Sequence, residues 1–346
     1  MRPIWATLLM TLRLALAPAA LASTTWYVNG TTGSDNNNCK SPTTACKTIG
    51  HAISLTVSGD TIKVASATYR ENLSIGISLS ILGSGAKTTF VNGGGRGSVV
   101  KISSTNANVA LSGVTITNGR AQSGGGLYNI GTLTINRSAV SGNTSSGNSG
   151  ASGGGGIYSS GTLTINNSTI SGNSAVLNCS QYCVAEGGGI VNSGPLIQLN
   201  NTTISGNSDS VGNCSKFCFM LGAIDNLNAS GNVIFQNSIL AGNSSANCEN
   251  TVISNGYNLS SDASCHFSNS GDLNDTDPML GPLQDNGGPT QTQALPSGSP
   301  AIDAGNPSGC TDGNGNLLKT DQRGKPRPDK EDTGGCDMGA YESQSD

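Results

Sequence analysis

The sequence predicts an all-β protein, a single right-handed parallel β-helix in which one strand-and-turn unit is repeated along the chain. Between residues 124 and 243, four segments follow the pattern GGGLY…GTLTIN…SAVSGN. The Asn residues that close them, Asn143, Asn173, Asn207 and Asn243, are spaced by 30, 34 and 36 residues. Apolar residues recur in the same columns of every copy, with the two-residue period of a β-strand. A repeat of roughly 20–50 residues is typical of solenoids, propellers and arrays.

Four apolar columns define the predicted coil. They are Leu127/Ile157/Ile190/Ile224, Leu133/Leu163/Ile197/Val233, Ile135/Ile165/Leu199/Phe235 and Val140/Ile170/Ile204/Leu240. With coils stacked about 4.8 Å apart, each column becomes an interior row, and each side chain contributes roughly 1.5–3 kcal/mol through burial. The Asn column is expected to form a ladder of amide hydrogen bonds at a turn. The alternative, a low-complexity linker, has no reason to keep four apolar columns aligned.

The first 22 residues have the features of a secretory signal peptide. They contain Arg2, an apolar run interrupted by Arg13, and the motif Ala-Leu-Ala before Ser23. The apolar run is shorter than the ~20 residues that a membrane-spanning helix needs. We therefore expect an exported chain with no transmembrane segment, in which residues 23–247 form the β-helix with its cap and residues 248–346 form a C-terminal region.

A short capping helix is predicted at the N-terminal end of the coil. Residues 47–57 place Ile49, Ala52, Ile53 and Val57 on one helical face. Such a helix would cover the first coil, whose unpaired backbone groups otherwise invite edge-to-edge association. Other strands in this part of the chain are expected at residues 25–28, 61–64, 75–82, 90–92, 99–102 and 109–116. The chain would then form roughly eight to ten coils, or about 40–50 Å of axis.

Ten cysteines in an exported chain indicate disulfides. Three local pairs are expected, namely Cys39–Cys46, Cys248–Cys265 and Cys310–Cys336. The other four, Cys179, Cys183, Cys214 and Cys218, form two CxxxC segments at the same place in consecutive repeats. They can pair within each loop or between stacked loops. Four thiolates at this spacing also resemble a zinc site, which an oxidising compartment disfavours.

The charge of the chain argues against two classes of partner. There are 17 Lys and Arg residues and 21 Asp and Glu residues. Removing Arg2 and Arg13 with the signal peptide leaves 15 against 21, a net charge of about −6. This mild acidity disfavours nucleic acid and anionic membranes as partners. We expect a monomer, with extracellular glycans or surface proteins as possible partners.

The end of the chain carries a second set of motifs. They are DTDPMLGPLQDNGGPTQTQALPSGSPAIDAGN at residues 275–306, TDQRGKPRP at 320–328 and CDMGAYE at 336–342, with GYNL near Tyr257. Together they resemble the choice-of-anchor Q domain of secreted bacterial β-helix proteins. The order of cap helix, GDTI strand and TYRENL strand resembles the pectate-lyase-like superfamily, and the GGGI and ISGN repeats resemble those of polymorphic outer-membrane proteins.

This resemblance implies an extracellular or cell-surface location and supplies no catalytic residues. Family members usually carry a sorting signal after this domain, whereas residues 341–346 are polar. Release is therefore expected rather than anchoring. Arg323 and Arg327 are expected to pair with neighbouring acids and to hold this region on the last coil.

An enzyme of the polysaccharide lyase or glycoside hydrolase kind is the alternative function. Such an enzyme needs several carboxylates on adjacent coils together with a base. Between residues 124 and 247 the charged residues are Arg137, Glu186, Asp209, Lys216 and Asp225. In the column alignment Glu186 lies opposite Met220 and Asp225 opposite Val191, so no two carboxylates are expected to stack. We therefore expect no catalytic residues and no bound cofactor apart from one candidate cation.

That candidate is a structural calcium ion. Its possible ligands are Asp272, Asn274, Asp275 and Asp277. Alternating Asp and Asn oxygens can bind calcium, but the same residues also build Asx-turns. The sequence as a whole predicts a secreted or cell-surface, non-catalytic β-helix protein that binds glycans or partner proteins in adhesion.

Overall fold

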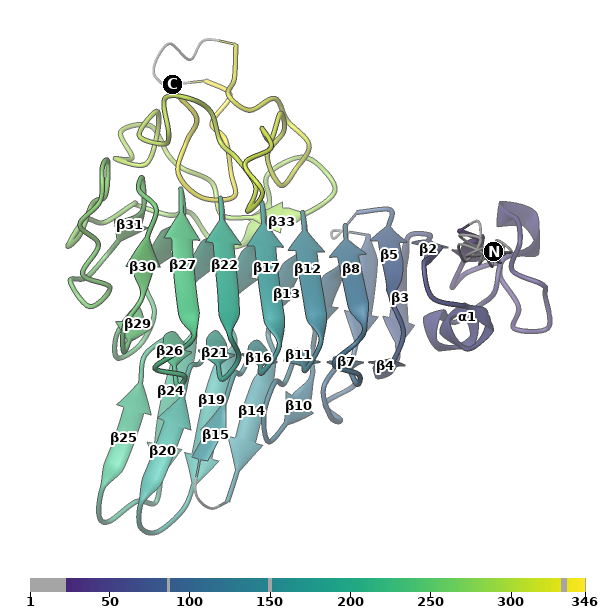
Figure 1. The fold of residues 1–346 in the computed structure, drawn as a ribbon, viewed down its shortest axis with the longest axis horizontal. Coiled ribbons are helices and arrows are strands. Elements are labelled where there is room, and N and C mark those ends of the chain that lie inside the picture. Colours follow the sequence, from purple (N-terminus) through teal and green to yellow (C-terminus); the bar gives the residue numbers. More distant parts are fainter. Residues whose placement is uncertain (1–22, 86–87, 149–150, 331–334, 346) are drawn as a thin grey trace, which may run out of the picture.

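The structure, a computed structural model, describes residues 23–85, 88–148, 151–330 and 335–345. The signal peptide predicted at residues 1–22 lies outside the described residues. Three walls of stacked parallel strands run along one axis, so the chain forms a parallel β-helix, as predicted (Figure 1). The longest wall has nine strands, in agreement with the number of coils expected.

Each coil adds one strand to each wall. The first wall contains β1 (Thr25–Val28), β2 (Asp60–Val64), β5 (Leu79–Gly83), β8 (Asn108–Ser112), β12 (Thr132–Asn136), β17 (Thr162–Asn166), β22 (Leu196–Asn200), β27 (Asn232–Gln236) and β30 (Ile253–Ser254). The second contains β3 (Ala67–Arg70), β6 (Thr89–Asn92), β9 (Thr115–Thr117), β13 (Ala139–Ser141), β18 (Thr169–Ser171), β23 (Thr203–Ser205), β28 (Ile239–Ala241) and β31 (Leu259–Ser260). The third contains β4 (Leu73–Ile75), β7 (Val100–Ile102), β11 (Leu127–Asn129), β16 (Ile157–Ser159), β21 (Ile190–Asn192), β26 (Ile224–Asn226) and β29 (Cys248–Glu249).

The predicted apolar columns fill the interior of the coil. All sixteen of their side chains are fully buried. The strand register pairs them as expected, for example Leu133 with Leu163 and Leu163 with Ile197. Thr134 and Thr164, the residues between the columns, are half-buried. The core thus follows from the two-residue alternation of side chains along each strand.

Stacked amides hold one corner of the coil. Asn143, Asn173 and Asn207 each donate their Nδ2 group to Oδ1 of the Asn in the next coil, at 3.0 Å. The same Oδ1 atoms also accept the backbone N–H of the donating residue, at 2.9–3.1 Å. These amides are almost fully shielded from water, so their hydrogen-bonding groups need such partners. The predicted Asn ladder is confirmed.

Glycine is required at the corner that precedes the third wall. Gly154 has a φ of +66°, in the left-handed region that glycine occupies without strain. A Cβ atom on the next residue, Gly155, would lie 2.4 Å from the carbonyl oxygen of Ser174. The GGG segments of the repeat therefore serve both a backbone conformation and a close approach of neighbouring coils.

The N-terminal end is closed by α1 (Ile49–Leu55), which follows the short 3₁₀ helix η1 (Pro42–Thr44). The helix is shorter than the predicted range of 47–57. Thr48 caps it by accepting the N–H of His51 at 3.2 Å. Glu71 accepts the N–H groups of the first two helical residues at 2.9 and 2.7 Å, a position that favours a carboxylate.

The strand predicted at residues 75–82 is in fact two strands on different walls. Ile75 ends β4, the chain turns a corner at residues 76–78, and Leu79 begins β5. The strand predicted at 109–116 divides in the same way into β8 and β9. Apolar residues stand on both sides of each corner, so hydrophobicity alone does not mark where the chain changes wall.

A flat projection that was not predicted from the sequence leaves the coils between the second and third walls (Figure 1). We call it the fin; it comprises the described residues of the connecting segments 118–126, 142–156, 172–189 and 206–223. Its outgoing strands are β10 (Arg120–Ala121), β14 (Thr144–Gly147), β19 (Ser174–Asn178) and β24 (Ser208–Gly212). Its returning strands are β15 (Ala151–Gly153), β20 (Cys183–Glu186) and β25 (Cys218–Leu221). Buried Ala175, Leu177 and Ala185 give it a small core of its own.

The C-terminal region folds back onto the corner between the first and second walls (Figure 1). Apart from the short antiparallel pair β32 (Gln284–Asp285) and β33 (Gln291–Thr292), it is irregular in its described part. Asn167, Asn201 and Asn237 occupy the corner in consecutive coils, with φ values of +44° to +51°. Their Nδ2 groups donate to backbone carbonyl oxygens of the C-terminal region at 2.7–2.8 Å. The repeat therefore supplies a row of amides that holds this region.

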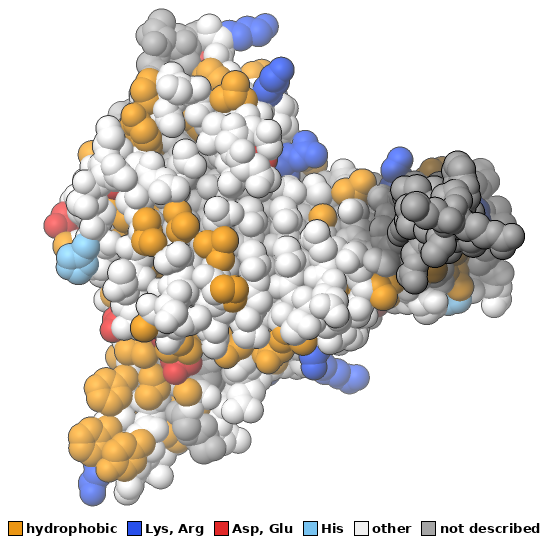
Figure 2. Space-filling view, viewed as in Figure 1, with side chains coloured by type: hydrophobic (Ala, Val, Ile, Leu, Met, Phe, Trp, Pro, Cys, Tyr) orange, Lys and Arg blue, Asp and Glu red, His pale blue; other side chains and the backbone are white. Residues whose placement is uncertain are grey.

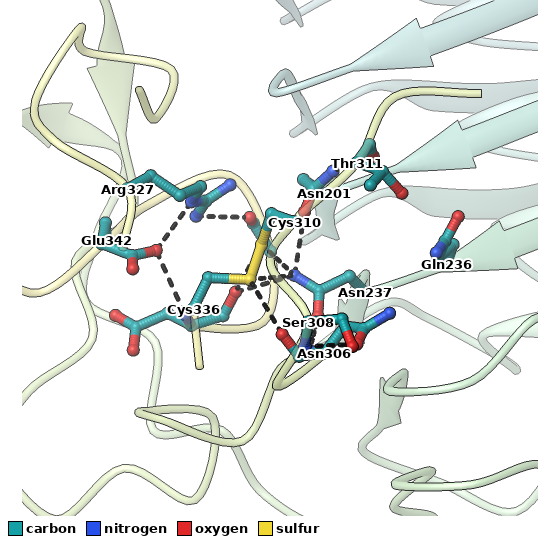
Figure 3. The surroundings of a disulfide bond; sticks show 12 residues. Asn201, Gln236, Asn237, Asn306, Ser308, Cys310, Thr311, Arg327, Cys336 and Glu342 are labelled. Carbon is teal, nitrogen blue, oxygen red and sulfur yellow. Dashed lines mark hydrogen bonds and ion pairs between the residues drawn. A yellow bond between two sulfur atoms is a disulfide. The ribbon is translucent and has the colours of Figure 1, made fainter. Parts of the chain in front are cut away.

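Two buried arginines pair with acids of the C-terminal region, as expected, but only Arg327 bonds to the coil, and it does so between β17 and β18 instead of at the last coil. Arg327 pairs with Glu342 at 2.6 Å and donates through Nη1 to Oδ1 of Asn167 at 2.8 Å. Figure 3 shows Arg327 and Glu342 beside Asn237 of the coil. Arg323 pairs with Asp321 at 2.7 Å.

Five disulfides brace the fold. The expected pairs Cys39–Cys46, Cys248–Cys265 and Cys310–Cys336 are present. Each CxxxC segment pairs within its own loop, as Cys179–Cys183 and Cys214–Cys218. None of these four sulfurs is left as a thiolate for zinc.

The coil continues past residue 247, the boundary expected from the sequence. Strands β29, β30 and β31 add a last strand to each wall. The Cys248–Cys265 bond encloses most of this final coil. The irregular C-terminal region therefore begins after β31.

Candidate functional site

Exposed aromatic side chains gather at the far end of the fin. Tyr182 is 64 % exposed, Phe217 56 %, Phe219 51 % and the neighbouring Met220 50 %. Every other aromatic side chain in the described residues is buried or half-buried. We call these four residues the fin-tip patch. Figure 2 shows hydrophobic side chains clustered on this part of the fin, and such clusters mark interaction sites.

Local chemistry makes the fin-tip patch rigid. Tyr182 and Phe217 stand at the same place in the two CxxxC segments, each with a left-handed φ just before the second cysteine. Their rings stack with centroids 4.9 Å apart and planes 11° apart. Exposed Lys216 is the adjacent charge. The matching aromatic residues in the two segments were the sequence signal that could have revealed this surface.

One residue pairing predicted from the sequence, that of Glu186 with Met220, is wrong. Glu186 lies opposite Leu221, not Met220, whereas Ile190 lies opposite Ile224 as expected. Partners in neighbouring coils are thus 35 residues apart in the returning strand of the fin and 34 apart in the wall. A slip of one residue moves each side chain to the other face of the sheet, so the columns of the walls do not extend into the fin.

Acidic side chains from consecutive coils meet at the base of the fin. Asp225 in β26 lies opposite Val191, as expected. On its other side it lies opposite Glu249 in β29, so two carboxylates do stack, against the sequence prediction. Glu186 belongs to the same group through its electrostatic interaction with Asp225. The column alignment missed Glu249 because this residue follows the last clear repeat.

Asp225 is fully buried within this acidic group. One carboxylate oxygen accepts a hydrogen bond from Nδ2 of Asn250 at 2.8 Å, and the other has no hydrogen-bond partner. Burial, together with the charges of Glu186 and Glu249, raises the pKa of Asp225 to about 7, against the opposing effect of the Asn250 hydrogen bond. Burial also raises the pKa of Glu186. In a mildly acidic medium Asp225 is therefore neutral.

A surface pocket of about 510 Å³ lies next to this group. Glu249, Asn250 and His266 contribute to its lining, whereas Asp225 does not. The pocket thus offers a carboxylate and an imidazole to a ligand, but the buried carboxylate of Asp225 is not accessible from it.

We expect the folded protein to lose stability through Asp225 as the pH rises from about 4 to about 7. The unfolded chain ionises this carboxyl near its ordinary pKa of 3.8, whereas the folded protein keeps the proton up to about 7. In this window the unfolded state binds fewer protons, so stability falls with rising pH. Asp225→Asn keeps an acceptor for Asn250 and should remove up to about 4 kcal/mol of this fall. Urea denaturation at about pH 4 and about pH 8 measures the effect.

Asp277→Asn is the matched control, because it removes an exposed carboxylate away from this group. Its pH dependence should equal that of the unmodified chain. If Asp225→Asn also retained the full pH dependence, the buried, protonated state of Asp225 would be excluded.

The four candidate calcium ligands are used in turns. Asp272 accepts the backbone N–H groups of Asn258 at 2.8 Å and Asn269 at 2.7 Å. Asn274 exchanges two hydrogen bonds with the backbone of Phe267. The carboxylates of Asp272, Asp275 and Asp277 do not form a group with mutual distances suited to a shared cation. The calcium site therefore stays a prediction.

Among the described residues, one group of metal-binding side chains has its ligand atoms within 4.8 Å of one another, namely Cys39, Cys46 and His51. The two sulfurs form a disulfide, so they are not thiolate ligands. No helix in the described ranges is long and apolar enough to cross a membrane. The five disulfides are typical of an oxidising compartment.

Neither a scan against protein-family models nor a search of curated proteins finds a match to this chain. The chain is a disulfide-braced parallel β-helix with an apolar fin tip and a buried acidic group at the base of the fin.

Proposed function

We propose that this chain is an exported, non-catalytic β-helix protein that acts in adhesion by binding an extracellular glycan or a surface protein through the fin-tip patch. One observation carries the proposal, namely the gathering of the exposed aromatic side chains at the end of the fin. Aromatic rings bring large contact areas to an interface at low entropic cost, and they are enriched where binding energy concentrates.

The construction of the fin supports this role. Two disulfides and the stacking of Tyr182 on Phe217 hold the tip in one conformation. A preorganised surface loses less conformational entropy when it binds. The single cation at the tip, Lys216, leaves the surface almost neutral, which suits an uncharged glycan or an apolar protein surface better than a polyanion.

The C-terminal motifs support the extracellular location in this proposal. Residues 275–306, 320–328 and 336–342 resemble the choice-of-anchor Q domain, and the coil resembles the pectate-lyase-like superfamily. Both resemblances favour an extracellular or cell-surface protein, and the five disulfides are consistent with export.

The test is binding by residues 23–346 to a glycan array and to immobilised surface proteins, with and without calcium. Tyr182→Ser combined with Phe217→Ser should weaken binding at least about tenfold, because two stacked aromatic contacts are lost. The matched control is Tyr128→Ser combined with Tyr158→Ser. This pair also stacks, with centroids 5.4 Å apart and planes 9° apart, but on the wall of the coil. Equal loss of binding in both double variants would argue against the fin tip.

A polysaccharide lyase or glycoside hydrolase is the second candidate, favoured by the pocket that Glu249 and His266 share. It predicts unsaturated products or new reducing ends when the protein is incubated with a polysaccharide panel. It further predicts that Glu249→Gln abolishes them, since general acid–base catalysis needs this carboxyl. Cleavage that depends on Glu249 would replace the adhesion proposal.

A further inference from the structure

The fin begins gradually and stops abruptly. From the N-terminal side, its connecting segments grow from 9 residues (118–126) to 15 (142–156) and then to 18 (172–189 and 206–223). In the next coil the corresponding connection, 242–247, has 6 residues and carries no fin. The first fin strand, β10, has two residues, whereas β25 is a full-length strand at the outer edge of its sheet (Figure 1).

The outer edge of β25 presents unpaired backbone groups. The carbonyl oxygens of Phe217 and Leu221 accept hydrogen bonds from the preceding layer, at 3.0 and 3.4 Å. Since alternate residues of a parallel strand bond to opposite sides, the N–H and C=O groups of Cys218 and Met220 point away from β20. No strand of the described chain pairs with them.

This edge lacks the features by which proteins protect a terminal strand. Charges on the strand, proline or a covering loop are usual means. The four residues of β25 include no charge and no proline, and Cys218, Phe219 and Met220 are exposed. The opposite end of the fin is tapered instead, so only one end is open to strand addition.

We propose that β25 pairs with β25 of a second copy of this chain in a symmetric, antiparallel dimer. A two-fold axis beside Phe219 places Cys218 opposite Met220 of the other copy, and Met220 opposite its Cys218. These are the residues whose backbone groups point outward. Hydrogen-bonded and non-bonded pairs alternate in an antiparallel ladder, so this register makes four hydrogen bonds and brings the two Phe219 rings together as a cross-strand aromatic pair.

Charge and symmetry favour a second copy in this arrangement. In this register the two Lys216 side chains stand six strand positions apart, roughly 20 Å, and do not oppose each other. A head-to-tail contact would instead have to use the two-residue strand β10 at the tapered end. An isologous contact closes on itself and leaves neither edge open. The dimer goes beyond the proposed function and uses Phe219 and Met220 of the fin-tip patch, so that Tyr182 and Phe217 are the part of the patch that binds the proposed glycan or surface protein. It departs from the monomer expected from the sequence.

Sedimentation velocity over a concentration series of residues 23–346 tests this inference. We expect a dimer at about 100 µM that dissociates on dilution. Met220→Pro removes an outward N–H without removing a hydrogen bond to β20, and it should raise the dissociation constant at least about tenfold. Phe219→Lys places like charges beside the axis and should abolish the dimer at low salt, with partial recovery at high salt.

Tyr182→Ser is the matched control, since it removes an exposed aromatic ring from the preceding layer and leaves the edge of β25 intact. It should dimerise like the unmodified chain. Peptide mapping without reduction confirms that each variant retains the Cys214–Cys218 bond and hence the fin loop. A chain that stays monomeric at about 100 µM, or a dimer unaffected by both Met220→Pro and Phe219→Lys, would overturn the proposal. Loss of glycan binding without loss of the dimer would concern the proposed function alone.

Discussion

Replacing Arg327 with methionine is expected to destabilise the attachment of the C-terminal region by about 3–5 kcal/mol, because the change leaves the buried Glu342 without its cation. Both side chains of this ion pair are fully buried. Arg327 also donates to the carbonyl oxygens of Gly339 and Tyr341, each at 2.9 Å. Its bond to Asn167 is the link to the coil. Burial raises the pKa of Glu342, and the Arg327 guanidinium opposes that rise.

Hydrogen exchange read separately in the C-terminal region and in the coil measures this effect, since local opening and global unfolding can have different free energies. Amides of residues 320–328 should lose protection first. Arg96→Met, at an exposed position, is the control and should change stability by less than about 0.5 kcal/mol. Unchanged protection in Arg327→Met would show that the ion pair does not hold the region.

The second large effect is expected from Asn173→Ala, at the centre of the Asn ladder. The Oδ1 atom of Asn173 accepts the backbone N–H and the Nδ2 group of Asn143. Its own Nδ2 donates to Asn207 and to the carbonyl oxygen of Val140. The substitution leaves several buried polar groups without partners, at about 1–3 kcal/mol each. We expect a total loss near 4 kcal/mol, at the upper end of single-substitution effects.

The midpoint of urea denaturation measures this loss of stability. The slope of the unfolding free energy against urea concentration checks that unfolding stays cooperative. Asn106→Ala is the matched control, because Asn106 is exposed and belongs to no ladder; its midpoint should stay close to that of the unmodified chain. A loss below about 1 kcal/mol for Asn173→Ala would mean that neighbouring amides or water replace the missing bonds.

The walls of the coil were predictable because their cause is local. A residue such as Ile165 is buried because it alternates with Thr164 along one strand, and the same alternation recurs in each copy. Asn173 could be placed in a ladder from its spacing alone, since equivalent residues of successive coils stack. The local disulfides, such as Cys39–Cys46, followed from the short separations of the cysteines in a chain that was expected to be exported.

The fin was not predictable by the same argument. Its strands are short and rich in Ser, Gly and Asn, and its core of small residues such as Ala175 and Ala185 gives a weak hydrophobic signal. The register in the fin also differs by one residue from that in the wall, as the pairing of Glu186 with Leu221 shows. Equal spacing therefore placed Glu186 opposite the wrong residue.

The sequence by itself determined the parallel coil, its apolar columns and its Asn ladder, because each depends on contacts between neighbouring repeats at a nearly constant spacing. Only the tertiary structure decided three other features: the exposed aromatic end of the fin, the stacking of Asp225 on Glu249, and the binding of the C-terminal region by Asn167 and its equivalents. The physical reason is separation along the chain. Asn167 and its partner Thr320 are 153 residues apart, and no periodic pattern links such residues until the coil has formed and its corner amides are in line.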